Sequence, residues 1–502
     1  MTLRREEWQG IVRDVDWTLG YVDDEAVYPD WLSGTGKVPR EAWSAWEESY
    51  KVAYPEYVAT QDEKETSAYA VKAALSRSNQ YEQLDEAWRS SVKMHLGGIA
   101  LVEYAAVYGE SRMARFGLSP AWRNMAVMGT LDEIRHGQLS LSFAHELVER
   151  DPQFDWAHRA LLTNDWVAIA LRALIDNMMI GGSVVDIAIQ LPFAFETGFT
   201  NIQFVALASD ALEAGDVAFA NLISSIQTDE ARHSQQGGPT LEVLVEHDPV
   251  RAQWTVDKFF WLSARAFAAL TGPSMDYNTP VESRKYSYRE FMEEWIIDQF
   301  VRTIQDYGLK RPWYWDEFIE GLDVWHHSLQ MGEWFWRPTL WWKPVGVSPE
   351  SREWLIEKYP NWDVLYGDKW KLLAENINAG NMHRALPETL PWLCNYCHLP
   401  TCNATYGRDG KWRVRNHSLK HNGVTYHFCT KGCRQIWWED RDALNSKTVV
   451  ERFLAGMIQP MDVPGILGYM GLTPDVMGDD AGAYDWTEAY AKTEPVVAGV
   501  GG

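Results

Sequence analysis

A five-residue sequence that occurs twice constrains this chain more than any other feature. Asp132-Glu-Ile-Arg-His136 returns, with one residue changed, as Asp229-Glu-Ala-Arg-His233. In a helix, Glu and His three residues apart lie on one face, so each copy can offer a carboxylate oxygen and an imidazole nitrogen to one metal ion. The repeat therefore predicts two metal ions held between two helices.

A single acid three residues before a histidine would mean little, because Asp323…His326 has the same spacing and such pairs are usually found on exposed helix surfaces. Repetition of the flanking Asp strengthens the interpretation. A metal-bound His usually gives its second ring N–H to a carboxylate, which fixes its tautomer. Asp132 and Asp229 are the candidates for that contact.

Two further carboxylates lie in apolar surroundings. Glu103 shares a helical face with apolar residues, and Glu196 is the only charged residue between Asp186 and Asp210. An unpaired buried carboxylate costs several kcal/mol or has a strongly raised pKa, so each is expected to have a partner. Four carboxylates and two neutral imidazoles balance two divalent cations, and these ligands suit iron, manganese or zinc.

The ligand order resembles that of a known enzyme family. Glu103, Glu133-x-x-His136, Glu196 and Glu230-x-x-His233 occur in this order in the hydroxylase large subunit of bacterial multicomponent diiron monooxygenases. The similarity extends over nearly the whole chain and includes the runs 196–204, 221–233 and 453–461. Among the branches, the chain is most similar to the alkene, isoprene and toluene monooxygenases, and the run 334–341 to their alkene-epoxidising side.

The resemblance implies an activity and a set of site residues. Glu103, Glu133, His136, Glu196, Glu230 and His233 would bind two iron ions that activate O2, and one oxygen atom would enter a small hydrocarbon. Epoxidation of isoprene or another small alkene is the expected reaction, with aromatic-ring hydroxylation of the toluene, benzene or phenol type as the alternative.

Three polar residues match catalytic positions of the family. Thr200 would lie beside the metal ions and donate a hydrogen bond or relay a proton, although a helix Thr often bonds the carbonyl four residues before it. Asn201 and Gln227 match positions that respond to docking of an effector protein.

A group of apolar residues matches the substrate pocket of the family. For each of them, ordinary core packing is the alternative. The two aliphatic side chains Ile175 and Met179 favour a small alkene over an aromatic ring. The pocket residues are Ile99, Val102, Ala106, Ile175, Met179, Phe195 and Phe204.

Helical patterning from about Glu41 to about Gly332 predicts a mostly α fold. We expect a ferritin-like four-helix-bundle diiron core within a larger helical domain, plus a small C-terminal α+β zinc-binding appendage. The expected divisions are 1–90 as an N-terminal extension and subunit-contact region, 91–345 as the hydroxylase domain and 346–502 as the C-terminal region. Seven tryptophans between Trp313 and Trp342 are interpreted as an oligomer surface.

All five cysteines lie between Cys394 and Cys433. Cys394-x2-Cys397 and Cys429-x3-Cys433 have nearly the spacing of a structural tetrahedral zinc site, in a module at about 390–440. Cys402 is left over. Disulfides are not expected in a reducing cytoplasm.

The chain lacks the means to take electrons from NADH alone. Its cysteines complete neither a ferredoxin nor a Rieske spacing, and no Gly-x-Gly-x-x-Gly follows a predicted strand. The resemblance implies that the missing parts are an NADH-dependent reductase, a Rieske-type ferredoxin, an effector protein, and β and γ subunits in an α2β2γ2 assembly.

The net charge of −24 and the pI near 5.0 argue against nucleic acid and anionic membranes as partners. The sequence has no run of about 18 uncharged apolar residues and no apolar signal segment after Met1, so we expect a cytoplasmic protein.

Other protein classes use the same ligand types. A ribonucleotide reductase radical subunit would need a tyrosine beside the cluster, and Tyr104 points off the face of Glu103. A fatty-acyl desaturase would lack the long shared runs, and a ferritin-like iron store would be a much shorter chain. A scaffold without catalysis would leave four buried carboxylates unexplained.

Overall fold

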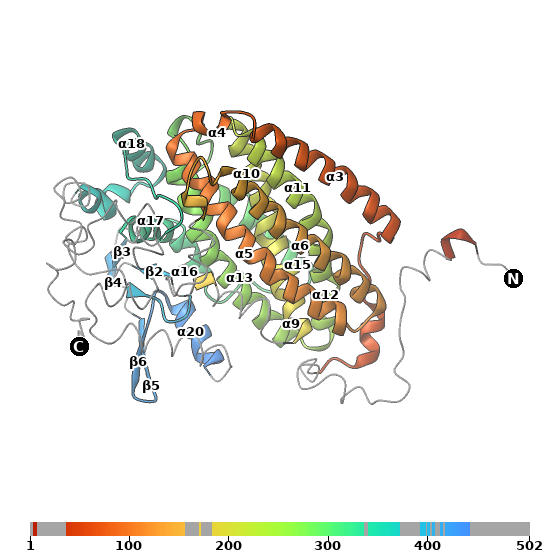
Figure 1. Ribbon diagram of the computed structural model, residues 1–502. Coiled ribbons are helices and arrows are strands. Elements are labelled where there is room, and N and C mark those ends of the chain that lie inside the picture. The colour runs from red at the N-terminus through yellow and green to blue at the C-terminus, as the bar shows by residue number, and fades with distance from the viewer. Residues whose placement is uncertain are drawn as a thin grey trace.

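The computed structural model describes residues 4–7, 37–155, 170–171, 183–335, 340–371, 392–397, 399–401, 404–406, 412–414 and 417–441. Long helices lie side by side in one body, and the short strands gather with α20 (Lys431–Asp440) at one end of it (Figure 1). This arrangement confirms the predicted mostly α fold with a small α+β appendage.

Four helical segments form the bundle that was predicted. They are α5 (Glu86–Phe116), α6 (Pro120–Leu147), α11 (Val217–His233), and the π-helix η4 (Ile189–Thr200) continued by α10 (Asn201–Glu213). Helix α5 packs along α6, α10 packs along α11, and α11 contacts both α6 and η4. Each pair is therefore a helical hairpin, and the two hairpins face each other.

Polar caps begin three of these helices. Asp85, Ser119 and Asp216 each accept a hydrogen bond from a backbone N–H in the first turn of α5, α6 and α11. Such a cap contributes about 1 kcal/mol to helix stability. The caps therefore help to determine where each ligand-bearing helix begins.

The segment that carries Glu196 is a π-helix, which sequence patterns did not predict. Its backbone hydrogen bonds reach five residues back, as from the N–H of Asn201 to the carbonyl of Glu196. The hydroxyl of Thr197 also donates to the carbonyl of Pro192 at 2.8 Å. A proline inside an α-helix removes one hydrogen bond and clashes with the preceding turn, and the wider π turn is an alternative geometry at this position. Helix α9 (Val184–Ala188), with a capping box formed by Ser183 and Asp186, leads into it.

Further helices surround the bundle. Helix α3 (Tyr54–Leu75) lies along the outside of α11 and α6 (Figure 1), and α13 (Pro249–Pro273) packs against η4 and α17 (Trp325–Phe335). None of the helices within the described ranges is long and apolar enough to cross a membrane. The remaining helical elements are η2 (Arg40–Ala45), α3 (Tyr54–Leu75), α4 (Gln80–Gln83), η5 (Ser234–Gln236), α12 (Gly237–His247), α13 (Pro249–Pro273), η6 (Ser274–Asn278), η7 (Val281–Ser283), α14 (Tyr288–Phe291), η8 (Met292–Ile297), α15 (Asp298–Asp306), α16 (Trp315–Gly321), α17 (Trp325–Phe335), α18 (Pro349–Lys358) and η10 (Asp363–Gly367).

The tryptophan-rich region differs from the oligomer surface that we expected. Trp325, Trp341 and Trp342 are buried within this chain, although Trp313 is exposed. The indole of Trp341 lies where a Cβ on Gly97 of α5 would be, and its N–H donates to the carbonyl of Lys93 at 3.1 Å. Large aromatic side chains bury much apolar area, so here they fill the core against α5.

The C-terminal appendage consists of short antiparallel strand pairs followed by α20. The best formed pair is joined at Asn422 and Gly423, which both have positive φ, as a two-residue type I′ turn requires. The division points of the chain at 90 and 345 stay predictions. The strands are β1 (Trp392–Leu393), β2 (Pro400–Thr401), β3 (Ala404–Tyr406), β4 (Trp412–Val414), β5 (His417–His421) and β6 (Val424–Phe428).

Candidate metal centre

The six predicted ligands come together inside the bundle. Glu103 lies on α5, Glu133 and His136 on α6, Glu196 on η4, and Glu230 and His233 in the last turn of α11; each is at most 5% exposed. The side chains of Glu133, His136, Glu230 and His233 have ligand atoms that all lie within 4.8 Å of one another.

Each histidine lies near one predicted carboxylate ligand of its own and near two carboxylates, Glu133 and Glu230, that both histidines share. His136 Nδ1 lies 3.4 Å from Glu103 Oε2 and 3.2 Å from Glu230 Oε1. His233 Nδ1 lies 3.2 Å from Glu196 Oε2, and its Nε2 lies 3.6 Å from Glu133 Oε1. With their ring centres 6.1 Å apart, the histidines mark two neighbouring positions for a cation.

Several atoms of this cluster are buried without a hydrogen-bond partner among the described residues. They are Glu133 Oε2, His136 Nδ1, Glu196 Oε1 and His233 Nε2. A buried polar atom without a partner is costly and rare, and carboxylate oxygens with imidazole nitrogens are the donors that non-haem iron uses. The residues therefore fit a pair of iron ions.

Burial also keeps protons on the cluster when no cation is present. Burial raises the pKa of Glu133, of Glu196 and, to about 7, of Glu230, and the neighbouring carboxylate of Glu103 raises each of these pKa values further. Burial acts against a charged Glu103 as well, but the neighbouring polar groups of Glu133 and His136 bring the pKa of Glu103 below its ordinary value. Bound cations would replace these protons.

The repeated Asp and Arg residues bind each other across the two motifs. Arg135 donates to Asp229 at 3.0 Å, and Arg232 donates to Asp132. The Nε2 atom of His136 lies 3.3 Å from Asp229, and the predicted role of that aspartate behind a metal-bound His stays a prediction. The hydrogen bonds of Asp132 go instead to Arg232 and to residues of α3.

Helix α3 contributes to the site, which the sequence interpretation missed. Tyr57 and Gln61 donate to Asp132 at 2.9 and 3.0 Å, and Lys64 lies 2.5 Å from Asp229. The sequence contained a sign of this contact, because the polar residues at 57, 61 and 64 share one face of a helix. Without a partner on another element, however, that face looked like any polar helix surface.

A fifth buried carboxylate was also missed. Glu110, two turns after Glu103 on α5, is fully buried and accepts hydrogen bonds from Gln236 at 2.9 Å. Its oxygen lies within 4.8 Å of ligand atoms of Glu196 and His233. Burial raises the pKa of Glu110 well above its ordinary value.

Two of the three predicted catalytic polar residues, Thr200 and Asn201, follow Glu196 along the chain, where η4 ends and α10 begins. Thr200 is 6% exposed, and its hydroxyl donates to the carbonyl of Phe195, five residues before it, at 3.2 Å. Asn201 donates to Ser234 at 3.3 Å. Gln227 is half-buried on α11. In an α-helix the Thr200 hydroxyl would bond the carbonyl four residues before it, and in this π turn it bonds the carbonyl five residues before it.

Most predicted pocket residues lie in the apolar core around the cluster. Ala106, Phe195 and Phe204 are buried, and Phe195 packs against the ring of Phe267 at a centroid distance of 5.5 Å. Ile99 and Val102 are partly buried against that core. Ile175 and Met179 lie outside the described residues.

Comparison with known proteins identifies the family. Residues 17–248 match the family described as methane/phenol/alkene hydroxylase. The oxygenase component subunit alpha of the alkene monooxygenase system of Xanthobacter autotrophicus strain Py2 is 47% identical, and the match covers 98% of each chain. This chain belongs to that family.

More distant relatives agree. The oxygenase component of phenol 2-monooxygenase from Pseudomonas sp. strain CF600 is 27% identical over 86% of this chain and 83% of its own. The crystal structure of phenol hydroxylase from Pseudomonas sp. OX1 has the same fold, with a TM-score of 0.79 over 94% of this chain and 96% of that one, at 24% identity. The chain is thus a hydroxylase α subunit of a diiron monooxygenase, and the family implies non-haem iron.

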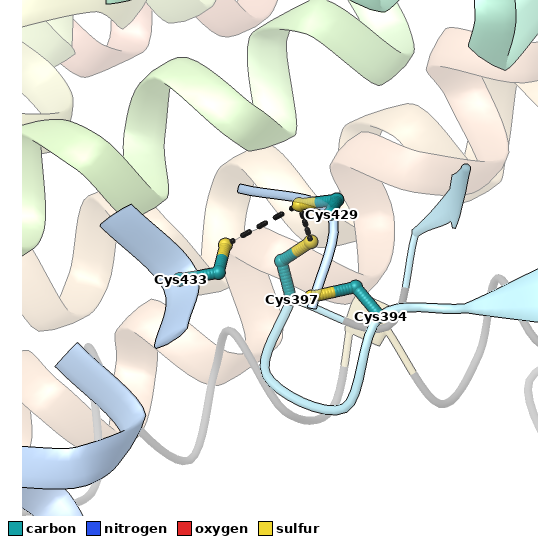
Figure 2. Close-up of side chains that lie close together, drawn as sticks. All are labelled: Cys394, Cys397, Cys429 and Cys433. Atoms are coloured by element: carbon teal, nitrogen blue, oxygen red, sulfur yellow. Dashed lines mark hydrogen bonds between the residues drawn. The ribbon is translucent and has the colours of Figure 1, made fainter. Parts of the chain in front are cut away.

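Four cysteines of this hydroxylase subunit gather at a second place, in the appendage. The sulfurs of Cys394, Cys397, Cys429 and Cys433 point toward one another (Figure 2), and all lie within 4.8 Å. Cys429 Sγ lies 3.8 Å from Cys397 Sγ and 3.5 Å from Cys433 Sγ. Sulfurs around a tetrahedral zinc ion would be about 3.8 Å apart, given Zn–S bonds of about 2.3 Å. The fifth, Cys402, lies outside the described residues.

The cysteine cluster is held against the diiron domain by α13. Trp261 donates to Cys433 at 3.2 Å. Burial alone would raise the pKa of Cys397, but hydrogen bonds with the other three thiols and the charge of buried Arg265 bring it well below its ordinary value. Burial and the neighbouring thiols raise the pKa of Cys394 and Cys433, whereas the pKa of Cys429 is lowered like that of Cys397. The positions of the four sulfurs fit a zinc ion.

Proposed function

We propose that this subunit binds two iron ions through Glu103, Glu133, His136, Glu196, Glu230 and His233, takes O2 as co-substrate and epoxidises a small alkene such as isoprene. The proposal depends mainly on the buried cluster of four carboxylates and two imidazoles with unpaired atoms, in a chain that is 47% identical to an alkene monooxygenase subunit.

The distances suggest a role for each ligand. Glu103 lies near His136, and Glu196 lies near His233, so each pair would hold one ion. Glu133 lies 3.7 Å from His136 and 3.6 Å from His233, and Glu230 lies 3.2 and 3.8 Å from them. Glu133 and Glu230 would therefore be shared by both ions.

The iron pair, when bound, supplies the redox chemistry that reduces O2 with two external electrons and transfers one oxygen atom. The chain's own residues orient and protect that reaction. Ile99, Val102, Ala106, Phe195 and Phe204, together with Ile175 and Met179, would form an apolar pocket that excludes water and holds a hydrocarbon by shape.

Polar groups beside the pocket would handle protons and docking. The hydroxyl of Thr200, now bonded to the Phe195 carbonyl, would turn to donate a hydrogen bond or pass a proton at the metal centre. Asn201, whose Oδ1 has no partner among the described residues, and half-buried Gln227 would respond to the effector protein.

Membership of a multicomponent family implies further subunits and an electron supply. We propose β and γ subunits in an α2β2γ2 assembly, an effector protein, and a Rieske-type ferredoxin with an NADH-dependent reductase. The absence of flavin and iron–sulfur motifs from the sequence supports an external supply of electrons.

Zinc bound by Cys394, Cys397, Cys429 and Cys433 would be structural. All four ligands are cysteines, so no position stays open for a substrate or water. The site would fasten the appendage to α13, because Trp261 of α13 donates to Cys433 and its ring occupies the place where a Cβ on Gly432 would be.

The alternative reaction is hydroxylation of an aromatic ring. It is supported by the 27% identity to the phenol 2-monooxygenase component. The identity to the alkene monooxygenase subunit is much higher and covers more of the chain, which favours epoxidation.

Mössbauer spectroscopy and metal analysis of the hydroxylase, purified with its co-purifying subunits, test the metal assignment. We expect about two spin-coupled irons per subunit, strongly reduced in Glu230→Ala but not in Glu242→Ala, which changes an exposed glutamate on α12. Turnover of isoprene, propene and toluene with reductase, ferredoxin and effector tests the substrate. Faster oxidation of toluene would move the proposal to the aromatic branch, and absence of coupled iron would refute it.

A further inference from the structure

Helix α3 is not one of the four bundle segments, yet three of its side chains contact the buried aspartates of the two repeated motifs. Tyr57, Gln61 and Lys64 lie on one face of α3, toward α6 and α11. The Gln61 amide donates to both aspartates of the repeated motifs, at 3.0 Å to Asp132 and 2.8 Å to Asp229. The helix therefore binds the two motifs together from outside the bundle.

Lys64 is connected to the cluster through two contacts. Its ammonium lies 2.5 Å from Asp229 Oδ1, and Asp229 Oδ2 lies 3.3 Å from His136 Nε2. The other nitrogen of that ring, Nδ1, faces the carboxylates of the cluster. The Lys64 side chain is 17% exposed, while Asp229 and His136 are fully buried.

The two oxygens of Asp229 have different neighbours. Oδ1 is contacted by Lys64, Gln61 and Arg232, whereas Oδ2 is contacted by Arg135 and His136. A cation on Oδ1 therefore fixes the rotation of the carboxylate, and the carboxylate in turn fixes the imidazole. Groups behind a metal-binding His orient the ring and strengthen it as a ligand.

We propose that Lys64 is a positioning residue of the metal centre: acting through Asp229, it holds His136 in its ligating orientation and slows the loss of iron. This inference rests on the proposed diiron function. Helix α3, which lies in the predicted N-terminal extension 1–90, would then help to retain the metal.

A purely structural role for Lys64, in docking α3 onto α6, can be separated from this one because α3 carries a matched control. Lys72, on the same helix, lies 2.6 Å from Ser142 and 3.1 Å from Glu146 of α6. Its side chain is 19% exposed, close to the value for Lys64. Its bonds end on α6 and do not reach the cluster.

The test measures the rate at which bipyridine captures Fe(II) from the reduced hydroxylase, purified with its co-purifying subunits. Replacement of outer groups commonly changes metal affinity by about 10–100-fold. We expect release at least about 10-fold faster from Lys64→Met than from wild type, with a changed Mössbauer quadrupole splitting. Lys64→Arg should restore both values, and Lys72→Met should leave both unchanged.

Two results would overturn the inference: wild-type release and splitting in Lys64→Met, or the same acceleration in Lys72→Met. If Lys64→Met does not fold, Gln61→Leu replaces it, with faster release expected and a wild-type rate contradicting the proposal. Failure of the diiron proposal is distinguishable, because the wild-type protein itself would then lack coupled iron.

Discussion

The reciprocal pairing of the two motifs predicts a strong effect for Arg232→Met. The Arg232 side chain is 9% exposed, donates to fully buried Asp132, and lies 3.2 Å from Asp229. Its guanidinium also stacks on the Tyr57 ring at 5.0 Å. Methionine keeps much of the apolar stem but removes the charge, so Asp132 would remain buried with only the neutral donors Tyr57 and Gln61.

Removal of one partner from a buried ion pair costs about 3–5 kcal/mol. Because Asp132 keeps two neutral hydrogen-bond donors, we expect a loss near the lower end, about 3 kcal/mol in the free energy of unfolding. Replacing the stranded carboxylate as well should recover part of that loss. The loss of unfolding free energy in the double variant Arg232→Met/Asp132→Asn should therefore be smaller, by roughly 2 kcal/mol, than the sum of the losses in the two single variants.

Urea unfolding of the four proteins in this double-mutant cycle, at equal protein concentration, measures both quantities. Lys285→Met is the control: its partner Glu213 is about as exposed as Lys285 itself, and loss of such a surface pair should leave the free energy of unfolding nearly unchanged. Additive effects of the two single variants would refute the pairing of the motifs as a source of stability.

Three more outcomes are expected. Glu230→Ala should lose iron and activity, whereas Thr200→Ala should retain iron, as metal analysis would check. Cys433→Ser should lose zinc and Cys402→Ser should keep it; equal zinc contents would contradict the ligand assignment. Burial raises the pKa of Asp257 to about 7. Between about pH 4 and pH 7 the folded protein therefore holds a proton that the unfolded chain has released, so the contribution of Asp257 to the free energy of unfolding falls as the pH rises through this range. In urea unfolding, the free energy of unfolding of Asp257→Asn should decrease between pH 5 and pH 8 by roughly 2–4 kcal/mol less than that of the wild type.

Local spacing was sufficient to predict the helical parts of the site. Glu133 with His136 and Glu230 with His233 are neighbours within one helix turn, so their shared faces follow from helix geometry alone. Glu103 and Glu196 were recognisable because an apolar stretch rarely contains a lone carboxylate. The resemblance joined these pieces into one bundle, and the comparisons confirmed the family.

Features that depend on contacts between distant segments were not predictable. The roles of Tyr57 and Lys64 depend on how α3 packs across α6 and α11. The hydrogen-bond donor to the Glu110 carboxylate is Gln236, which is far away in the sequence. The tryptophans near Trp341 were assigned to a subunit surface because composition alone does not distinguish a core from an interface. The π-helix arises from a hydrogen-bond shift that leaves no periodic pattern.

The two hairpins contribute equivalent ligands but unequal surroundings. Each gives one Glu and one Glu-x-x-His pair, so the ligand set alone would make the two metal positions alike. Among the described residues, Asp229 lies at Nε2 of the first histidine, His136, whereas Glu196 of the π-helix lies at Nδ1 of the second, His233, with Glu110 close by. On the proposed ligand assignment, the ion at His136 would therefore have charged groups behind its imidazole, while the ion at His233 would adjoin the wide π turn that carries Thr200.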